Sequence, residues 1–369
     1  MKMLVSCVPF DGGNSGISTY IRSIVSALSE SGQNLTLILE KDAESQFPEF
    51  DKIVLPGYCR RAIFSMLYHL FILPFRIRWK KFDCCLVTAA NRRFFCRTPI
   101  FTMAVVHDLS QYNVKNKYDV FRTFYIKRIL PFFVSRSNKV IAISNSTAND
   151  LKRHWKIPEE KIELVYNGLS LPEGHEIHPV DWMKRAGISK PYILYLARLE
   201  HPGKNHVGLI EAYNMLPKEL VEKYDLVLPG KEFSGFEAIH EAALKSPYSA
   251  NIHFTGFIDE ADKREAYTNA ACFVFPSFSE GFGLPLIEAM HYGIPCACSN
   301  TTALGEIGNG AAILFNPEST HEIRDAICRI LSSEETRKRL VTAGIRRAAE
   351  FSWQKAAEQM VEIAQKRDK

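Results

Sequence analysis

The chain has 369 residues, of which 46% are hydrophobic and 24% are charged, so the composition is that of a globular protein and excludes a disordered one. This length is long for a single hydrophobic core, and we expect two domains. The formal net charge is +5, but residues 1–170 contain 24 of the 46 Lys and Arg residues and only 14 of the 41 Asp and Glu residues. The basic character therefore belongs to the first half, which predicts a surface for an anionic partner there.

The sequence shows no signal for export and none for insertion into a membrane. The first residues, Met1–Val8, read as a strand that runs into a Gly-rich loop, and not as a signal peptide with a cleavage site. No stretch reaches about 18 apolar residues without a charge, so we expect no membrane span. The nine cysteines, with a Cys84-Cys85 pair and a Cys296-Ala-Cys298 motif, match neither a disulfide framework nor a zinc site. We expect a cytoplasmic protein with reduced thiols.

The chain opens with a predicted β-α-β unit of a parallel sheet. A strand over Met3–Val8 leads through a Gly-rich loop to a helix over Ile17–Leu28, and a strand follows at Leu35–Leu39. The loop contains Gly13 and Gly16 but fits neither the dinucleotide fingerprint nor the Walker A motif. From these residues alone, it is either a tight turn or an anion contact at the start of the helix.

Two predicted helical segments mix aromatic and basic residues. They cover 60–82 and 117–133, and the region 60–139 that contains both has 16 Lys and Arg residues against 3 Asp and Glu residues. Helices of this kind can lie in a membrane interface with their basic groups over anionic headgroups. The alternative is an ordinary core helix with solvated basic flanks. Nucleic acid is a third partner class, but no nucleic-acid-binding motif accompanies the charge, and we expect none.

The rest of the first half continues the strand and helix alternation. A strand over Ile100–Val106 ends at His107 and Asp108, and the carboxyl end of a parallel strand is where open α/β sheets bind ligands. The turn signal Asn167-Gly168 closes this half, and the segment Leu171–Pro179, with two prolines and a glycine, is the predicted linker. The remaining elements expected here are a strand over 139–144, a helix over 145–155 and a strand over 162–166.

A second parallel sheet follows the linker. Arg198 and Lys204 flank the loop between its first strand, Tyr192–Leu196, and a helix over Val207–Leu216, so both side chains can point into a cleft at the end of that strand. The further strands are expected at 225–228, 252–255, 272–275, 294–298 and 310–315. Two doubly wound α/β domains are the simplest architecture for this pattern.

The stretch Pro276–Met290 is the most informative part of the second half. A tight loop with Glu280 leads into a short helix that has Pro285 in its first turn and Glu288 about one turn in. The first amides of this helix, near Phe282–Leu284, form a natural anion site, and two carboxylates beside it can accept from hydroxyls. Such a set suits a ligand that is part sugar and part phosphate. The alternative is a common Gly-Pro loop with glutamates that only face water.

These motifs together resemble those of retaining GT-B glycosyltransferases of family 4, the group 1 glycosyltransferases. The resemblance rests on the E-x7-E motif of Glu280 and Glu288, on Arg198 and Lys204 upstream of it, and on the Gly-rich loop near the start of the chain. It covers nearly the whole chain and implies a GT-B fold, in which two Rossmann-like domains face each other across a cleft. The implied domains are 1–170 on the acceptor side and 171–351 on the donor side, with a C-terminal helix at about 352–369 that returns to the first domain.

The resemblance also implies roles for single residues. Arg198 and Lys204 would bind the diphosphate of a nucleotide sugar, Glu280 would accept from hydroxyls of the sugar, and His107 would reach the sugar from the first domain. Together these four would be the catalytic set. The donor-binding residues would be Gly13, Gly16, Gly230, Lys231, Gly256, Phe257, Ile258, Phe282, Gly283, Leu284 and, on the ribose, Glu288.

The implied reaction is a retaining transfer of a hexose to a polysaccharide or a lipid-linked oligosaccharide. The aromatic and basic segments of the first half lead us to expect this transfer at the inner face of the cell membrane. No Asp-x-Asp motif occurs in the sequence, so we expect no metal and no other cofactor. The motif Pro229-Gly230-Lys231 departs from the family pattern and leaves the base open. The first expectation for the donor is a UDP-hexose such as UDP-glucose, and the second is GDP-mannose, because His107-Asp108-Leu109 also suits mannosyltransferases. The alternatives are an enzyme similar to nucleotide-sugar 2-epimerases and a membrane-associated scaffold without activity.

Overall fold

The computed structural model describes residues 1–369 except 14, 110–111, 113–119, 171–180 and 367–369. It divides into two compact units, which we call unit 1 (Met1–Ser170 with Phe351–Lys369) and unit 2 (Leu171–Glu350). The predicted linker Leu171–Pro179 lies outside the described residues.

Unit 1 is built on a parallel sheet that has seven strands within the described residues, in the order β3-β2-β1-β4-β5-β6-β7. Its strands are β1 (Lys2–Ser6), β2 (Asn34–Leu39), β3 (Asp51–Val54), β4 (Cys84–Val87), β5 (Phe101–Val106), β6 (Lys139–Ala142) and β7 (Ile162–Leu164). Its helices are α1 (Gly16–Glu30), α2 (Ala62–Leu67), α3 (Leu73–Arg76), α4 (Val120–Phe124), α5 (Leu130–Val134), α6 (Asn145–Asp150) and α16 (Trp353–Gln365), with short helical turns η1 (Lys41–Gln46), η2 (Gly57–Arg60), η3 (Tyr68–Ile72), η4 (Trp79–Lys81), η6 (Tyr125–Ile129), η7 (Leu151–Trp155) and η8 (Glu159–Lys161). The central strands β1, β4, β5 and β6 are buried along almost their whole length and mostly apolar, because helices cover both faces of such a sheet.

Unit 2 contains a second parallel sheet, with six strands among the described residues in the order β10-β9-β8-β11-β12-β13. The strands are β8 (Tyr192–Leu194), β9 (Asp225–Val227), β10 (Ile252–His253), β11 (Ala270–Phe275), β12 (Cys296–Ser299) and β13 (Ala312–Phe315). The helices are α7 (Trp182–Arg185), α8 (His206–Asn214), α9 (Lys218–Lys223), α10 (Phe236–Leu244), α11 (Glu260–Thr268), α12 (Leu284–His291), α13 (Thr302–Ile307), α14 (Thr320–Ser332) and α15 (Glu334–Ala348), with a short turn η9 (Ser249–Asn251).

Each sheet has one topological switch point, where successive connections leave in opposite directions. In unit 1 it lies between the paired strands β1 and β4, and in unit 2 it lies between β8 and β11. Open α/β sheets bind ligands at the carboxyl ends of the strands beside this point. In unit 2 the loops there contain Arg198, Lys204 and Glu280, and in unit 1 one of them is the Gly-rich loop. The topology thus supports the ligand positions that the sequence predicts.

The two aromatic and basic segments are helical, but each is interrupted by a wide π-turn before a proline. The turn η3 precedes Pro74 and η6 precedes Pro131, within the repeated motif Ile-Leu-Pro-Phe. A proline lacks the N–H that would bond to the carbonyl four residues before it. In both segments that carbonyl has another partner: Leu70 accepts from the Cys96 amide at 2.9 Å, and Lys127 accepts from the Tyr112 hydroxyl at 3.4 Å. Residues 117–119 of the predicted segment lie outside the described residues.

Two strands of unit 1 have no counterpart in the sequence prediction. One is the edge strand β3, and the other is β4, in which the Cys84-Cys85 pair is fully buried. All nine cysteines are free thiols, seven of them buried and Cys96 and Cys328 half-buried. In the described part of the chain, no helix has the length and apolar character needed to cross a bilayer.

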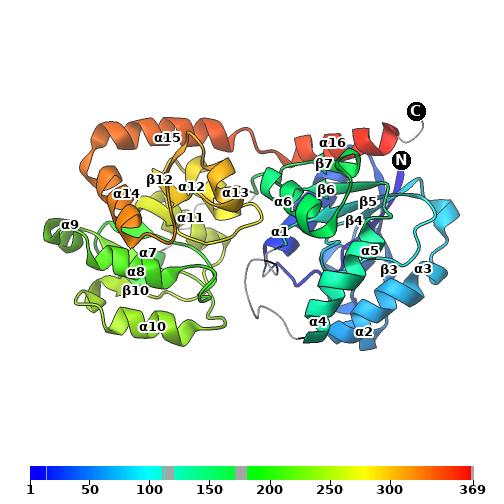
Figure 1. The fold of residues 1–369 in the computed structure, drawn as a ribbon, viewed down its shortest axis with the longest axis horizontal. Helices are drawn as coiled ribbons and strands as arrows, with labels where there is room; N and C mark the ends of the chain where they lie inside the picture. The colour runs from blue at the N-terminus through cyan, green and yellow to red at the C-terminus, as the bar shows by residue number, and fades with distance from the viewer. Residues whose placement is uncertain (14, 110–111, 113–119, 171–180, 367–369) are drawn as a thin grey trace. The chain divides into compact units, whose positions relative to one another are not determined.

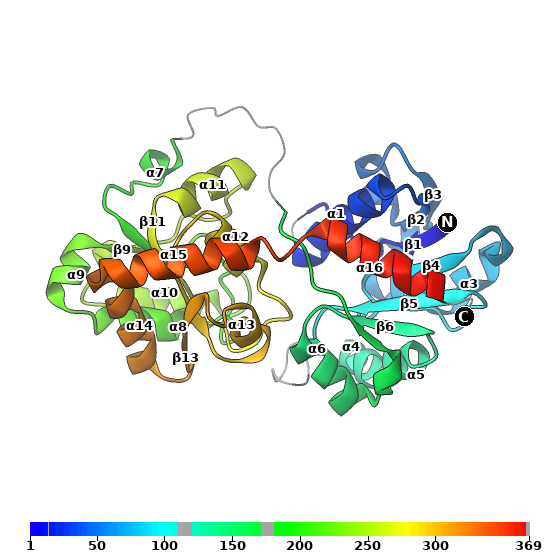
Figure 2. The same cartoon turned by 90° about the horizontal axis from the view of Figure 1, so that it is seen from above.

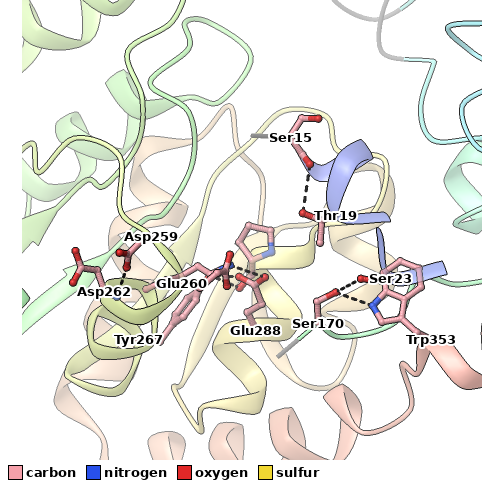
Figure 3. A network of polar contacts seen from close by, with 12 residues as sticks. Ser15, Thr19, Ser23, Ser170, Asp259, Glu260, Asp262, Tyr267, Glu288 and Trp353 are labelled. Atoms are coloured by element: carbon pink, nitrogen blue, oxygen red, sulfur yellow. Dashed lines mark hydrogen bonds and ion pairs between the residues drawn. The ribbon is translucent and has the colours of Figure 1, made fainter. Parts of the chain in front are cut away.

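The C-terminal helix α16 belongs to unit 1 and lies along α1 (Figure 2). Its first residue, Trp353, packs its ring 5.4 Å from that of Tyr20 on α1 and donates its indole N–H to Ser170 Oγ at 2.8 Å. The Ser170 hydroxyl also pairs with Ser23 Oγ at 2.8 Å (Figure 3). Tyr20 in turn lies edge-on to the ring of His107, 4.6 Å away. The end of the chain therefore supports the packing around His107.

Candidate functional site

Lys204 and Glu280 form a close ion pair in unit 2. The ammonium group of Lys204 donates to Glu280 Oε1 at 2.6 Å, and the two side chains are only 18% and 15% exposed. One residue follows β8 and the other follows β11, so the two loops meet at the switch point. A cation for phosphate and a carboxylate for hydroxyls are thus held side by side, as the two parts of a sugar phosphate would require.

Hydrogen bonds between the same two loops fix this pair. The buried Tyr195 hydroxyl donates to the carbonyl of Lys204 at 2.9 Å and shares a 3.0 Å bond with Ser277. Asn205, in the left-handed conformation before α8, donates to the carbonyls of Pro276 and Pro317. Burial and the neighbouring Glu280 carboxylate raise the pKa of Tyr195, so its hydroxyl keeps its proton. The loops form one preorganised unit in which Lys204 has little freedom to move.

Arg198 is more exposed than Lys204 and has two neighbours of its own. Its guanidinium lies 3.0 Å from Glu200 Oε2 and 4.6 Å from the centre of the Phe233 ring. The Arg198 side chain remains 46% exposed, whereas Glu200 is largely buried. The stacked ring fixes the plane of the guanidinium without occupying its donors, which leaves them able to reach a phosphate.

Glu288 lies on α12 within a network of buried polar groups that Figure 3 shows. The Tyr267 hydroxyl donates to its Oε2 at 2.9 Å, and Lys263 donates to its Oε1 at 3.3 Å and also pairs with Glu260 at 2.8 Å. Burial opposes the charge on Lys263, but the carboxylates of Glu288 and Glu260 outweigh it and raise the pKa of Lys263. Glu288 is thus a fixed carboxylate with two partners, and it retains lone pairs that can accept further hydrogen bonds.

Helix α12 begins at a backbone turn that requires glycine. Gly283 precedes the helix with a φ of +101°, and no side chain caps the N-terminus. A Cβ on Gly283 would also lie 2.7 Å from Leu304 Cδ2. Pro285 occupies the first turn, and the Phe282 side chain is buried beneath it. The helix dipole and the uncapped amides at Gly283 and Leu284 suit an anion.

The loops after β9 and β10 contain the remaining predicted donor contacts of unit 2. Gly230 fits so tightly that a Cβ there would lie 1.9 Å from the carbonyl oxygen of Ala197, and its amide donates to Gly256 at 2.8 Å. Lys231 accepts from the Leu199 amide through its carbonyl at 3.0 Å. Phe257 presents a ring that is 67% exposed, whereas Ile258 is buried. The role of Gly230 in this structure is close packing of loops, and the Phe257 ring is the group free to stack on a base.

His107 is the predicted site residue of the first half, and it lies at the end of β5 in unit 1. Its Nε2 donates to the carbonyl of Thr88 at 2.7 Å, which leaves Nδ1 as the acceptor of the neutral ring. Burial lowers the pKa of His107 to about 4. Gly13, with a φ of +102°, and Gly16, the first residue of α1, belong to the loop after β1. All three follow strands on the same edge of the sheet.

The sequence did not predict three residues around these groups. Tyr267 and Lys263 come from α11, and no local motif indicates that this helix packs beside Glu288. Asn91 follows β4 and donates to the carbonyl of Asp108 at 3.1 Å, while its buried Oδ1 has no partner among the described residues. Had the Cys84-Cys85 pair been recognised as part of a central strand, Asn91 would have been predicted to lie at the switch point.

We predict that acid destabilises unit 1 through His107. The folded protein holds this imidazole neutral to about pH 4, whereas the unfolded chain protonates it near its ordinary pKa of 6.5, so stability falls as pH falls between these values. By about pH 5, one such histidine lowers the free energy of unfolding by on the order of 2 kcal/mol. Urea unfolding at about pH 7 and about pH 5 measures it, and H107N should lose less stability than the wild type across this window. An equal loss in both proteins would contradict a buried neutral His107.

A metal site is not apparent in the part of the chain that the structure describes. No three His, Cys, Asp or Glu side chains there lie close enough together to hold an ion.

Two family descriptions match the chain in sequence. "Glycosyl transferases group 1" matches residues 181–347, and "Glycosyltransferase Family 4" matches residues 14–172. The two matches together extend over both units.

Several similar curated proteins are mannosyltransferases. The serotype-specific mannosyltransferase WbdA of Escherichia coli is 32% identical over 70% of this chain, and O-antigen chain mannosyltransferase B of the same species is 28% identical over 69% of it. The match spans 32% of the length of WbdA and 68% of the length of the second relative.

Solved structures establish the GT-B fold that the sequence predicts. Sucrose-phosphate synthase from Thermosynechococcus elongatus superposes with a TM-score of 0.77 at 18% identity, over 99% of this chain and 98% of that one. Anabaena HepE, solved with UDP and glucose, superposes with a TM-score of 0.74 at 16% identity, over 99% and 100% of the two chains. At these identities the likeness concerns the fold.

Proposed function

We propose that this chain, which belongs to the group 1 glycosyltransferases of glycosyltransferase family 4, transfers mannose from GDP-mannose to a glycan. The observation that carries the transferase function is the Lys204–Glu280 pair at the switch point of unit 2, with Arg198 on the same loop as Lys204. The names of the relatives support mannose, and they reverse the order of donors expected from the sequence, in which UDP-glucose came first.

The proposed chemistry follows from the charge that develops when the sugar–phosphate bond breaks. Negative charge grows on the β-phosphate of the leaving nucleoside diphosphate, and Lys204, Arg198 and the first amides of α12 oppose it. Glu280 accepts from hydroxyls of the transferred sugar, and Glu288 accepts from those of the ribose. The neutral His107 accepts a sugar hydroxyl through Nδ1. We propose that the reaction retains the anomeric configuration and needs no metal.

The acceptor that we propose is a polysaccharide or a lipid-linked oligosaccharide. The O-antigen relative supports this class, since its name refers to a glycan chain. The two alternatives from the sequence make different demands. An epimerase releases a nucleotide sugar or a free sugar without an acceptor, and a scaffold binds no donor at all.

A panel of UDP- and GDP-sugars, incubated with the full chain and glycan acceptors in the presence of EDTA, tests the function. We expect GDP release that depends on GDP-mannose and acceptor and persists in EDTA, and NMR of the product should show the anomeric configuration of the donor. A requirement for a divalent ion would contradict the metal-free mechanism. Conversion of the donor without an acceptor would favour the epimerase, and E280A that bound donor as well as the wild type would favour the scaffold.

A further inference from the structure

Unit 1 exposes an unusual set of apolar side chains on its two aromatic and basic segments. We define the aromatic–basic surface by the nine large hydrophobic residues exposed there: Ile63, Phe64, Leu67, Phe71, Ile72, Phe75, Phe121, Phe124 and Phe132. Among the described residues of the whole chain, fifteen large hydrophobic side chains are exposed, so these two segments contain most of them. Exposure reaches 67% at Phe75 and 82% at Phe121. Such a concentration on one surface marks an interaction site.

The nine exposed residues do not lie at the margin of the side of each segment that packs into the core. The opposite side of each segment already fills the core of unit 1, where Leu70 and Leu73 join Tyr125 and Leu130 in one buried cluster with the sheet. An ordinary surface helix would present polar residues on its outer side. Here the outer side repeats apolar residues at helical spacing, as in Phe64, Leu67, Phe71 and Phe75. The segments are therefore apolar on two sides, and the second side has no partner within the described unit.

The two segments lie next to each other and form one surface. The rings of Phe71 and Phe133 are 6.5 Å apart in an edge-on arrangement, and Figure 1 shows α2, α3, α4 and α5 within the same half of the ribbon. The repeated Ile-Leu-Pro-Phe motif places an exposed phenylalanine after each proline, Phe75 in one segment and Phe132 in the other. Because the two aromatic and basic segments pack on the same core cluster, the outer sides of both segments point away from the sheet.

The charge around this surface has one sign. Residues 60–82 and 120–136 contain no Asp or Glu, while Arg and Lys occur throughout. The exposed basic residues are Arg60, Arg61, Arg76, Arg78, Lys80, Lys81, Arg128 and Arg136. The Arg136 guanidinium lies 3.7 Å from the centre of the Phe132 ring, so cation and aromatic group share one position. Phenylalanines surrounded by cations fit an apolar layer beneath an anionic one.

We propose that the aromatic–basic surface docks unit 1 onto a membrane that contains anionic phospholipids, with Phe75, Phe121 and Phe132 in the interfacial layer and the basic residues on the headgroups. Each Lys or Arg near such a surface strengthens the attraction to anionic headgroups, and salt weakens that attraction. A protein partner is the competing occupant, and the absence of any Asp or Glu from residues 60–82 and 120–136 favours the anionic lipid surface, which presents charge of one sign. This docking involves unit 1 only, so it does not depend on the proposed donor chemistry.

Co-sedimentation of the full chain with vesicles, without donor or acceptor, tests the proposal. The wild type should bind vesicles of phosphatidylcholine mixed with phosphatidylglycerol, bind vesicles of phosphatidylcholine alone far less, and dissociate as salt rises. The double variant F75S/F121S should lose at least about tenfold in vesicle affinity. The matched control is L244S on α10 of unit 2, because Leu244 is 66% exposed outside this surface.

Charge is tested separately with R78E/R128E, which should lose affinity for the anionic vesicles and little for the neutral ones. Melting temperatures near that of the wild type would show that the variants fold. Equal vesicle binding by F75S/F121S and L244S would overturn the proposal, as would the absence of any vesicle binding by the wild type. A wild-type dimer that F75S/F121S dissociates, without vesicle binding, would identify the surface as a contact between copies of the chain and would also refute the membrane.

Discussion

Replacement of Lys204 by Met should lower kcat/KM for glycosyl transfer by about 10²–10³-fold, mostly through kcat. The ammonium group is only 18% exposed and lies 2.6 Å from Glu280, where solvent screens it poorly. The charge that it opposes grows during bond cleavage, so its loss weakens the transition state more than the bound donor. Met preserves the length and packing of the chain. The measurement is release of nucleoside diphosphate at saturating and at low donor.

The control for this result is K245M, because Lys245 is an exposed lysine just after α10 whose ion pair with Glu241 faces solvent. Its activity should equal that of the wild type. The variant E280Q provides a second comparison. If Lys204 and Glu280 act as one unit, the fold-loss of kcat/KM in the double variant K204M/E280Q should be smaller than the product of the fold-losses in the two single variants. Wild-type kcat in K204M would remove Lys204 from the proposed mechanism, whatever the identity of the donor.

The sequence predicted the positions that depend on local pattern. The apolar run Cys272–Phe275 predicts a strand, and the glycines and Pro285 after it predict a turn and a helix start. The structure confirms them in β11, at Gly283 and in α12. Strand order follows less directly, but the alternation of strand and helix restricts a parallel sheet to few topologies. The two parallel-sheet domains could therefore be predicted before any coordinates.

Contacts between distant segments could not be predicted in this way. Tyr267 reaches Glu288 only because α11 packs beside α12, and nothing in the local sequence around Tyr267 encodes that distance. The short strand β4 was missed because four buried residues, two of them cysteines, give no periodicity. The π-turns before Pro74 and Pro131 depend on whether another group takes the freed carbonyl, which is a property of the fold. The sequence thus predicts the loops at the switch points better than the distant residues that pack against them.

Gly168→Ala is expected to have a large effect on the fold of unit 1. A Cβ at Gly168 would lie 2.2 Å from the backbone nitrogen of Trp353 and 2.5 Å from its Cγ. The backbone nitrogen cannot rotate away, so the start of α16 must move, and the bond from Trp353 to Ser170 moves with it. We expect a loss of about 3 kcal/mol in the stability of unit 1. Urea unfolding and amide hydrogen exchange in α16 measure it.

G57A is the matched control, since no atom lies within 4 Å of a Cβ at Gly57, and its stability should stay equal or rise slightly. The effect of G168A should also reach the candidate site. Trp353 packs on Tyr20, and Tyr20 packs on His107, so displacement of Trp353 loosens the His107 ring, for which we propose a role in sugar binding. G168A should therefore lose transfer activity below its melting temperature, while W353F, which retains an aromatic ring on Tyr20, keeps more of it. If amide exchange in α16 were the same in G168A as in the wild type, the prediction would be wrong. The start of α16 would then be held by contacts other than those of Trp353 near Gly168.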